Sequence, residues 1–239
     1  MESKQSDLAE IQDFFRRYRG ITQDLSKDRV HRFQTEFIRL KNELEPLLDR
    51  RKENERKWAP FFNVFRVLRL EGKEVITHSA ILAELLDPDG RPSQGFLFLR
   101  EFFKEAQNIK LALPSVEDQT KRWIVEREKV TEKGNLDIVI KCPALQYMLV
   151  IENKIYAGEQ GSQLQRYSEW MQEQKSYKDR QLIYLTPDGR KADTAGEYPY
   201  FRMSYCENIR KFLINCLREV KAPKLTETLG QYLETVENL

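Results

Sequence analysis

The chain of 239 residues has few cysteines and histidines and no long apolar run. Its three cysteines (Cys142, Cys206 and Cys216) are odd in number and lack C-x-x-C spacing, so they predict reduced thiols and exclude a disulfide framework or a cysteine zinc site. With only His31 and His78 present, a histidine-rich metal site is also excluded. No stretch approaches the length of a membrane span, and the first residues lack the apolar region of a signal peptide. We therefore expect a soluble, cytoplasmic protein without membrane association.

Neither sign of charge dominates the sequence. Lysine and arginine number 40 and aspartate and glutamate 38, which gives a formal net charge of +2. Such a balance is not that of a generally basic nucleic-acid-binding chain, so any contact with nucleic acid must come from a local basic patch. The length allows one large domain, or one domain with an appendage.

The first seventy residues have a helical pattern of apolar residues. One stripe is formed by Val30, Phe33, Phe37, Leu40 and Leu44, which are spaced 3, 4, 3 and 4 residues apart. Most such stripes face a core, which favours a helix packed on its own domain. The alternative is a contact with a second copy of the chain or with a partner protein, although two heptads are too few to predict a coiled coil, which needs about three or four.

Several signals divide this helical region. Pro46 is expected to end or restart the helix, because proline is tolerated only in a first helical turn. The run RRKENERK at 50–57 is interpreted as a solvated helix face, with phosphate contact as the alternative. A further helix is predicted over Ala59–Leu70, before the break at Gly72.

The pattern of apolar residues changes from helix to strand near residue 122. Two apolar helices, over Thr77–Leu86 and Phe96–Ala106, precede this point and are separated by a turn signal. Three short runs joined by tight connections then predict an antiparallel meander: Trp123–Val130, Leu136–Cys142 and Tyr147–Lys154.

The rest of the chain completes an α/β pattern. A helix over Gly158–Glu173, strands over Gln181–Leu185 and Phe201–Tyr205, and two final helices are predicted. The expected fold is a central mixed sheet, containing the three-stranded antiparallel meander, flanked by helices. We divide the chain into an N-terminal helical extension (1–70), a core (71–205) and C-terminal helices packed on that core (206–239).

The third predicted strand ends in charged residues. The apolar run Met148–Ile151 is followed by Glu152, Asn153 and Lys154, and alternation along a strand puts the glutamate and the lysine on one face. The meander places Asp137 near Glu152. Two carboxylates at this range repel each other unless a cation lies between them, and Mg²⁺ binds such pairs. Lys154 can orient or deprotonate an attacking water and offset charge on a phosphate.

A structural ion cluster at the end of the sheet is the alternative interpretation of these three charged residues. Buried ion pairs of that kind seldom add net stability, which weakens this alternative without removing it.

A longer pattern links these residues to a known family. It consists of G-x-x-D, then fourteen residues, E-x-K, then eight residues and Q-x-x-x-Y, formed by Gly134, Asp137, Glu152, Lys154, Gln163 and Tyr167. This pattern resembles the PD-(D/E)XK nuclease superfamily, and its last element is similar to that of the RecB-type branch. The resemblance covers about 74–205 and implies a restriction-endonuclease-like core. Leu136 stands where the family's namesake motif has proline, a position that varies within the superfamily.

The resemblance implies a role for each residue of the pattern. Asp137 and Glu152 would bind Mg²⁺, or alternatively Mn²⁺, together with the backbone carbonyl of Asn153. Lys154 would act on the nucleophilic water. On the next helix, Gln160 and Gln163 would hold the metal ligands or the DNA backbone, and Tyr167 would pack over the site and hydrogen-bond the lysine.

Other polar residues before the meander are assigned less directly. The family often adds a carboxylate from the helix before the sheet, and Glu74 is the first choice for it, with Glu84 second. His78 is expected to be a packed or capping histidine. Glu126 and Glu128 share a face of the first strand and could approach the site, although the favoured interpretation is that both are ordinary exposed carboxylates.

By this resemblance the protein is expected to be a Mg²⁺-dependent deoxyribonuclease. Its substrate would be DNA, with RNA as the alternative, and its setting would be genome maintenance or phage defence. One alternative from another class is a non-cleaving, nuclease-like module that binds nucleic acid or a protein. Another is an assembly protein that forms a homodimer or binds a partner through its N-terminal helices.

Overall fold

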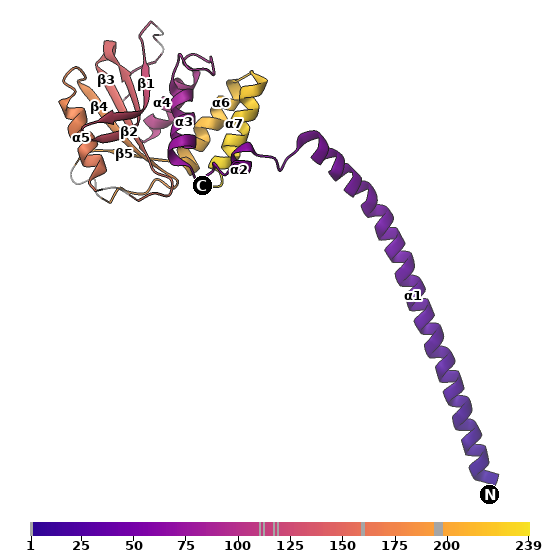
Figure 1. Cartoon of the computed structure of the whole chain (residues 1–239). Helices are drawn as coiled ribbons and strands as arrows, with labels where there is room; N and C mark the ends of the chain where they lie inside the picture. The colour runs from indigo at the N-terminus through magenta and orange to yellow at the C-terminus, as the bar shows by residue number, and fades with distance from the viewer. Residues whose placement is uncertain are drawn as a thin grey trace. The chain divides into compact units, whose positions relative to one another are not determined.

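The computed structural model describes the chain except for residues 1, 110, 112, 117, 119, 159–160 and 194–197, and except for the side chains of 2–11 and 25–26. The chain forms two compact units, Met1–Phe62 and Asn63–Leu239. Figure 1 shows the first as a helix and the second as a sheet covered by helices. In the part of the chain that the structure describes, no helix combines the length and apolarity needed to cross a membrane.

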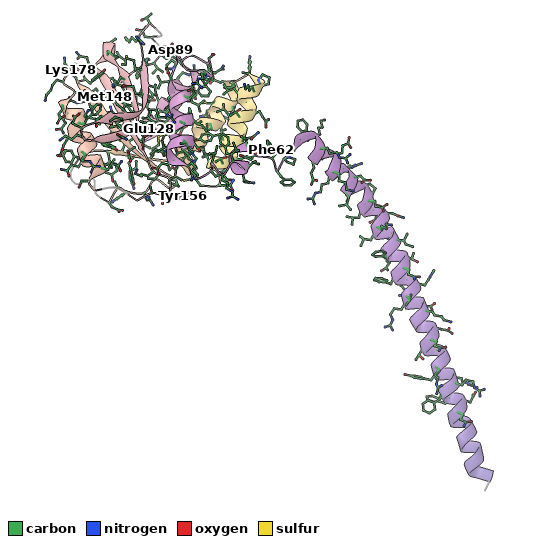
Figure 2. All side chains as sticks on the ribbon, in the orientation of Figure 1. Phe62, Asp89, Glu128, Met148, Tyr156 and Lys178 are labelled. Atoms are coloured by element: carbon green, nitrogen blue, oxygen red, sulfur yellow. The ribbon has the colours of Figure 1, made fainter. Side chains whose placement is uncertain are left out.

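The first unit is dominated by one helix, α1 (Glu2–Trp58), which contains Pro46. The prediction that this proline ends or restarts the helix is therefore wrong. A proline removes one helical hydrogen bond, but the segment that follows it is rich in leucine, glutamate, lysine and arginine, which are strong helix formers. The described side chains of α1 project from all sides of the helix (Figure 2).

The second unit is built on a five-stranded sheet with the order β1-β2-β3-β4-β5. The strands are β1 (Ile124–Thr131), β2 (Gly134–Cys142), β3 (Tyr147–Asn153), β4 (Asp179–Thr186) and β5 (Phe201–Ser204). The first three strands are antiparallel neighbours, whereas β4 runs parallel to β3 and β5 parallel to β4. The predicted meander and the mixed sheet are thus confirmed.

Helices lie on both faces of this sheet. The helices of this unit are α2 (Val64–Val67), η1 (Glu74–Ser79), α3 (Ala80–Leu86), α4 (Leu97–Asn108), η2 (Pro143–Leu145), α5 (Gln163–Glu173), η3 (Tyr205–Ile209), α6 (Arg210–Glu219) and α7 (Pro223–Val236). Figure 1 shows α5 on one face and α3, α4, α6 and α7 on the other. Alternation along the strands explains the two cores: Val150 packs under α5, and Ile151 packs in the core of the opposite face.

Two predicted helix boundaries are wrong. The helix expected over Ala59–Leu70 is only the single turn of α2, which begins where the side chain of Asn63 accepts hydrogen bonds from two backbone N–H groups. Arg69, just after this turn, has a left-handed backbone, which ends a helix. The helix expected from Gly158 begins at Gln163, because Ser162 before it is also left-handed.

Candidate active site

Two carboxylates meet where β2 and β3 adjoin. Ile138 pairs with Ile151 across these strands, so Asp137 and Glu152 are the next opposed residues. The Asp137 carboxylate accepts a hydrogen bond from the backbone N–H of Asn153, with 2.7 Å between Oδ2 and N. Both acidic side chains are buried, and Glu152 is 0% exposed. The structure therefore brings together the two carboxylates that the sequence pairs.

Lys154 lies between two glutamates. Its Nζ is 2.8 Å from Oε1 of Glu152 and 3.4 Å from Oε1 of Glu74. Its backbone N–H donates to the carbonyl of Leu185 in β4 over 2.8 Å, which fixes the chain just after β3. The single ammonium group is thus shared by carboxylates from β3 and from η1.

Glu74 joins the site from the helix before the sheet, whereas Glu84 does not. The second oxygen of Glu74 accepts a hydrogen bond from the backbone N–H of Ile155 over 2.7 Å. Glu84 instead accepts from the backbone N–H of Arg91 in the turn after α3. Of the two candidates taken from the sequence, only the first choice contacts the lysine.

Asn153 points to the opposite face of β3, as alternation predicts. Its amide nitrogen donates to Oγ of Ser79 over 3.0 Å, and its amide oxygen accepts from the hydroxyl of Tyr205 over 3.0 Å. These contacts attach the end of β3 to η1 and η3. Sequence reasoning did not find the serine or the tyrosine, because both contacts span more than 50 residues and no local pattern marks them.

His78 is a packed histidine. It is fully buried, and its two ring nitrogens lie 3.1 Å from the hydroxyl of Tyr232 and 2.7 Å from the backbone carbonyl of Glu71. Burial lowers the pKa of His78, although the contact with the Glu71 carbonyl opposes this shift. The side chain therefore links η1 to α7 and is held uncharged.

The carboxylates at the site are electrostatically unfavourable for one another. Burial raises the pKa of Asp137 to about 6 against the opposing hydrogen bond from Asn153. Burial and the nearby Asp137 raise the pKa of Glu152 well above its ordinary value, although Lys154 opposes the shift. Burial disfavours the charge on Lys154, yet Glu152 and Glu74 outweigh it and raise the pKa of the lysine. One cation therefore offsets more than one buried carboxylate.

The donor set fits a divalent cation such as Mg²⁺. The buried carboxylate of Glu152 has two neighbours among the described residues, the Lys154 ammonium at 2.8 Å from Oε1 and the carboxyl of Asp137. Mg²⁺ uses one or two carboxylates and fills its other positions with water and substrate phosphate. Among the described residues no group of three or more His, Cys, Asp or Glu side chains is arranged to hold a metal. The third nearby carboxylate, Glu74, is occupied by Lys154 and a backbone N–H.

Gln163 and Tyr167 face the sheet from α5. Both are buried; Nε2 of Gln163 donates to the Tyr167 hydroxyl over 2.7 Å, and that hydroxyl donates to the backbone carbonyl of Asn135. Burial and then the neighbouring Glu152 raise the pKa of Tyr167 to about 12. The pair therefore attaches α5 to β2 two residues before Asp137. Gln160 lies outside the described residues.

Gly134, the glycine of the G-x-x-D element, has a backbone conformation that requires a glycine. Its φ of +129° is a conformation that residues with a Cβ rarely adopt, and an added Cβ would lie 3.3 Å from a ring carbon of Tyr167. The glycine therefore lets the tyrosine ring approach the start of β2.

Glu128 lies nearer to the site than the sequence indicates. The register of β1 and β2 puts it opposite Asp137, and its φ of +50° is unusual for a residue other than glycine. Its Oε1 is buried and has no hydrogen-bond partner among the residues described, and burial raises the pKa of this carboxyl. Figure 2 labels Glu128 within the sheet unit. By contrast, Glu126 forms ion pairs with Lys129 and Lys141.

The fold and the site together define a restriction-endonuclease-like α/β protein with a carboxylate pair and a lysine at the end of its central strands. A sequence model of the PD-(D/E)XK nuclease superfamily matches residues 62–234. The chain belongs to the PD-(D/E)XK nuclease superfamily, as the pattern of residues predicts, and membership indicates a nuclease. No curated protein and no solved structure matches the chain. The similarity to the RecB-type branch stays a prediction.

Proposed function

We propose that the protein is a Mg²⁺-dependent deoxyribonuclease. The observation that carries the proposal is the carboxylate of Glu152, which is fully buried, lies beside the carboxylate of Asp137 and, among the described residues, has Lys154 as its cation, an ammonium group that it shares with Glu74. A buried carboxylate is costly unless it is paired, hydrogen-bonded or bound to a metal. Lys154 offsets only part of the charge at this site, and a divalent cation would offset the rest.

Asp137 and Glu152 are the proposed metal ligands, together with the backbone carbonyl of Asn153, and Mn²⁺ is the alternative ion. When bound, such an ion polarises a phosphodiester and stabilises the charge that develops as the bond breaks. Asn153 also holds Asp137 in place, because its backbone N–H donates to the aspartate. Its side chain, fixed on the other face of β3, keeps this segment of backbone in one position.

Lys154 is the proposed catalytic ammonium group. Its ion pairs with Glu152 and Glu74 favour the protonated form, which donates hydrogen bonds and has no lone pair to accept a proton. We therefore infer that it orients the attacking water and offsets charge on the phosphate, and that it does not act as the base. Glu74 is a positioning residue that holds Lys154 in reach of the site.

Gln163 and Tyr167 are proposed to position the carboxylates. Their hydrogen bonds fix the backbone at Asn135, close to Asp137. Replacing Tyr167 by phenylalanine removes the hydroxyl that makes this link and keeps the ring that packs on Gly134. The variant should bind Mg²⁺ more weakly than the wild type.

DNA is the proposed substrate, with RNA as the alternative, and superfamily membership supports a nucleic acid of either kind. We also propose a cytoplasmic location. The cysteines are free thiols in the structure, two of them buried, which is typical of proteins in reducing compartments. Genome maintenance or phage defence is the setting that the family resemblance implies.

The test combines calorimetric titration of Mg²⁺ and Mn²⁺ with cleavage of plasmid DNA, linear DNA and RNA. Lys154→Ala should keep metal binding but lose roughly 10²–10³-fold in cleavage rate, the scale of a lost donor that stabilises charge in the transition state. Asp137→Ala should lose both, because it removes a metal ligand. Lys211→Ala, which breaks an exposed ion pair on α6, is the control and should change neither. A wild-type protein that binds no metal and cuts no nucleic acid would support the non-cleaving binding module instead.

A further inference from the structure

The apolar stripe of α1 extends further than five residues. Leu47 continues the spacing, so that Val30, Phe33, Phe37, Leu40, Leu44 and Leu47 recur at intervals of 3, 4, 3, 4 and 3 residues. These intervals are those of the first and fourth positions, a and d, of successive heptads, which form the seam of a coiled coil. All six side chains are at least 47% exposed within their helix. The stripe therefore has the pattern of a coiled-coil seam and is exposed along its length.

Pro46 fits a coiled coil with this seam. If Val30 occupies position a, the proline falls at position c, on the outer side of the helix. A proline there removes a backbone hydrogen bond and bends the helix, but its ring stays off the seam, and of the six seam residues only Leu47 follows it. The seam ends after Leu47, because Arg51 and Asn54 occupy the next a and d positions.

The charges beside the seam indicate which way a second helix runs. The flanking g positions are Arg29, Glu36, Glu43 and Arg50, and the flanking e positions are Gln34, Lys41, Leu48 and Glu55. In a parallel coiled coil, each g residue faces the e residue five positions later on the other helix. That pairing brings Glu36 to Lys41 and Arg50 to Glu55, and both pairs have opposite charges.

If the second helix ran antiparallel and paired over the same seam residues, like charges would come together. There, g residues face g residues, so that Arg29 meets Arg50 and Glu36 meets Glu43. Like charges at these positions disfavour the arrangement. The ion pairs within α1, such as Arg51–Glu55 at 2.7 Å, are exposed, and exposed pairs contribute little stability. They do not prevent the same side chains from pairing between helices.

We propose that α1 forms a parallel two-stranded coiled coil with α1 of a second copy of this chain, with its seam over 30–47 and its charge pairs over 36–55. Both chains then leave the coiled coil at the same end, after Trp58. The inference rests on the pattern of α1 alone and does not depend on the proposed nuclease activity.

The first test measures the mass of the full chain by sedimentation equilibrium. A dimer has twice the chain mass of 28.5 kDa. Leu40→Glu combined with Leu44→Glu places charges in the seam and should give a monomer. Glu36→Lys should weaken the dimer about five- to tenfold through repulsion with Lys41, and adding Lys41→Glu should restore it. Glu53→Lys, on the outer side of α1, is the matched control and should leave the mass unchanged.

Orientation is tested separately by cross-linking, in a chain whose exposed Cys206 is replaced by serine. Leu47→Cys should form an interchain disulfide under mild oxidation, because equivalent d positions face each other in a parallel pair. In the antiparallel arrangement the same cysteine would face Val30 and would not cross-link. A monomeric wild-type chain, which would result if the stripe packed within one molecule, overturns the proposal. A dimer without the cross-link overturns the parallel orientation.

Discussion

Replacing Lys154 by alanine should destabilise the second unit strongly in metal-free buffer. The lysine is 6% exposed and is the cation between Glu152 and Glu74, at 2.8 and 3.4 Å. Removing it leaves the buried carboxylates of Glu152 and Asp137 side by side with no positive charge in contact. Protonation of one carboxyl relieves part of this repulsion, but the site loses the buried ion pairs of Lys154 with Glu152 and Glu74.

The expected magnitude follows from these distances. With an effective dielectric constant of about 20, Coulomb's law gives about 6 kcal/mol for the 2.8 Å contact and about 5 kcal/mol for the 3.4 Å contact. Much of this is offset by the cost of burying the ammonium group, and breaking a buried pair typically costs about 3–5 kcal/mol net. For a domain of this size, 1 kcal/mol lowers Tm by about 2–4 °C. The expected loss is therefore roughly 6–20 °C.

The assay is thermal unfolding followed by circular dichroism at a wavelength that reports the sheet, in EDTA and then in Mg²⁺. A bound cation should replace the missing positive charge, so that Mg²⁺ raises the Tm of Lys154→Ala more than that of the wild type. Lys211→Ala is the matched control, since its ion pair with Glu207 has nearly the same length, 2.9 Å, but is exposed. That control should leave Tm nearly unchanged, because an exposed ion pair contributes little stability. Equal losses in the two variants would refute the reasoning.

Three further predictions concern other parts of the chain. Gly134→Ala should cost about 1–3 kcal/mol in urea unfolding because of its positive φ, whereas Gly230→Ala, with open space around it in α7, should stabilise by up to about 1 kcal/mol. His78→Gln should make the free energy of unfolding depend less on pH below about pH 6.5. The pKa of His78 is lowered in the folded protein, so the unfolded chain binds the proton first as the pH falls, and the wild type loses stability in acid. An unchanged slope would contradict this. If the protein is a dimeric nuclease, the Leu40→Glu, Leu44→Glu variant should nick plasmid DNA with fewer double-strand breaks than the wild type.

The sheet could be predicted because its signals are local. The runs that form β1, β2 and β3 are short and rich in β-branched or apolar residues, and tight turns join them, so that neighbours in sequence are neighbours in space. The same locality brings Asp137 to Glu152, since they are opposed across one antiparallel pair. The E-x-K spacing then puts Lys154 on the same face. These three residues needed no long-range contact to be placed together.

What the sequence did not predict depends on contacts or backbone conformations far from the residue itself. Ser79 and Tyr205 reach Asn153 only after η1 and η3 pack on the sheet. Glu128 comes close to the site through a left-handed backbone that a strand pattern does not reveal. The predicted helix at 59–70 fails for a similar reason, because Asn63 starts a new turn by capping it and by bonding to α7.

The charged end of β3 has a physical explanation that unites the fold with the proposed chemistry. From Tyr147 to Asn153 every side chain of β3 is buried, so Glu152 is anchored by a strand that cannot shift toward water. A carboxylate on a mobile loop would relax into solvent or turn to the nearest lysine. Here the two opposed carboxylates are held together against their mutual repulsion, and folding of the apolar strand supplies the free energy that keeps them there. Binding of a divalent cation would relieve that repulsion, and this relief would add to the binding free energy. Because the two carboxylates are already held in place, no free energy would be needed to bring them together.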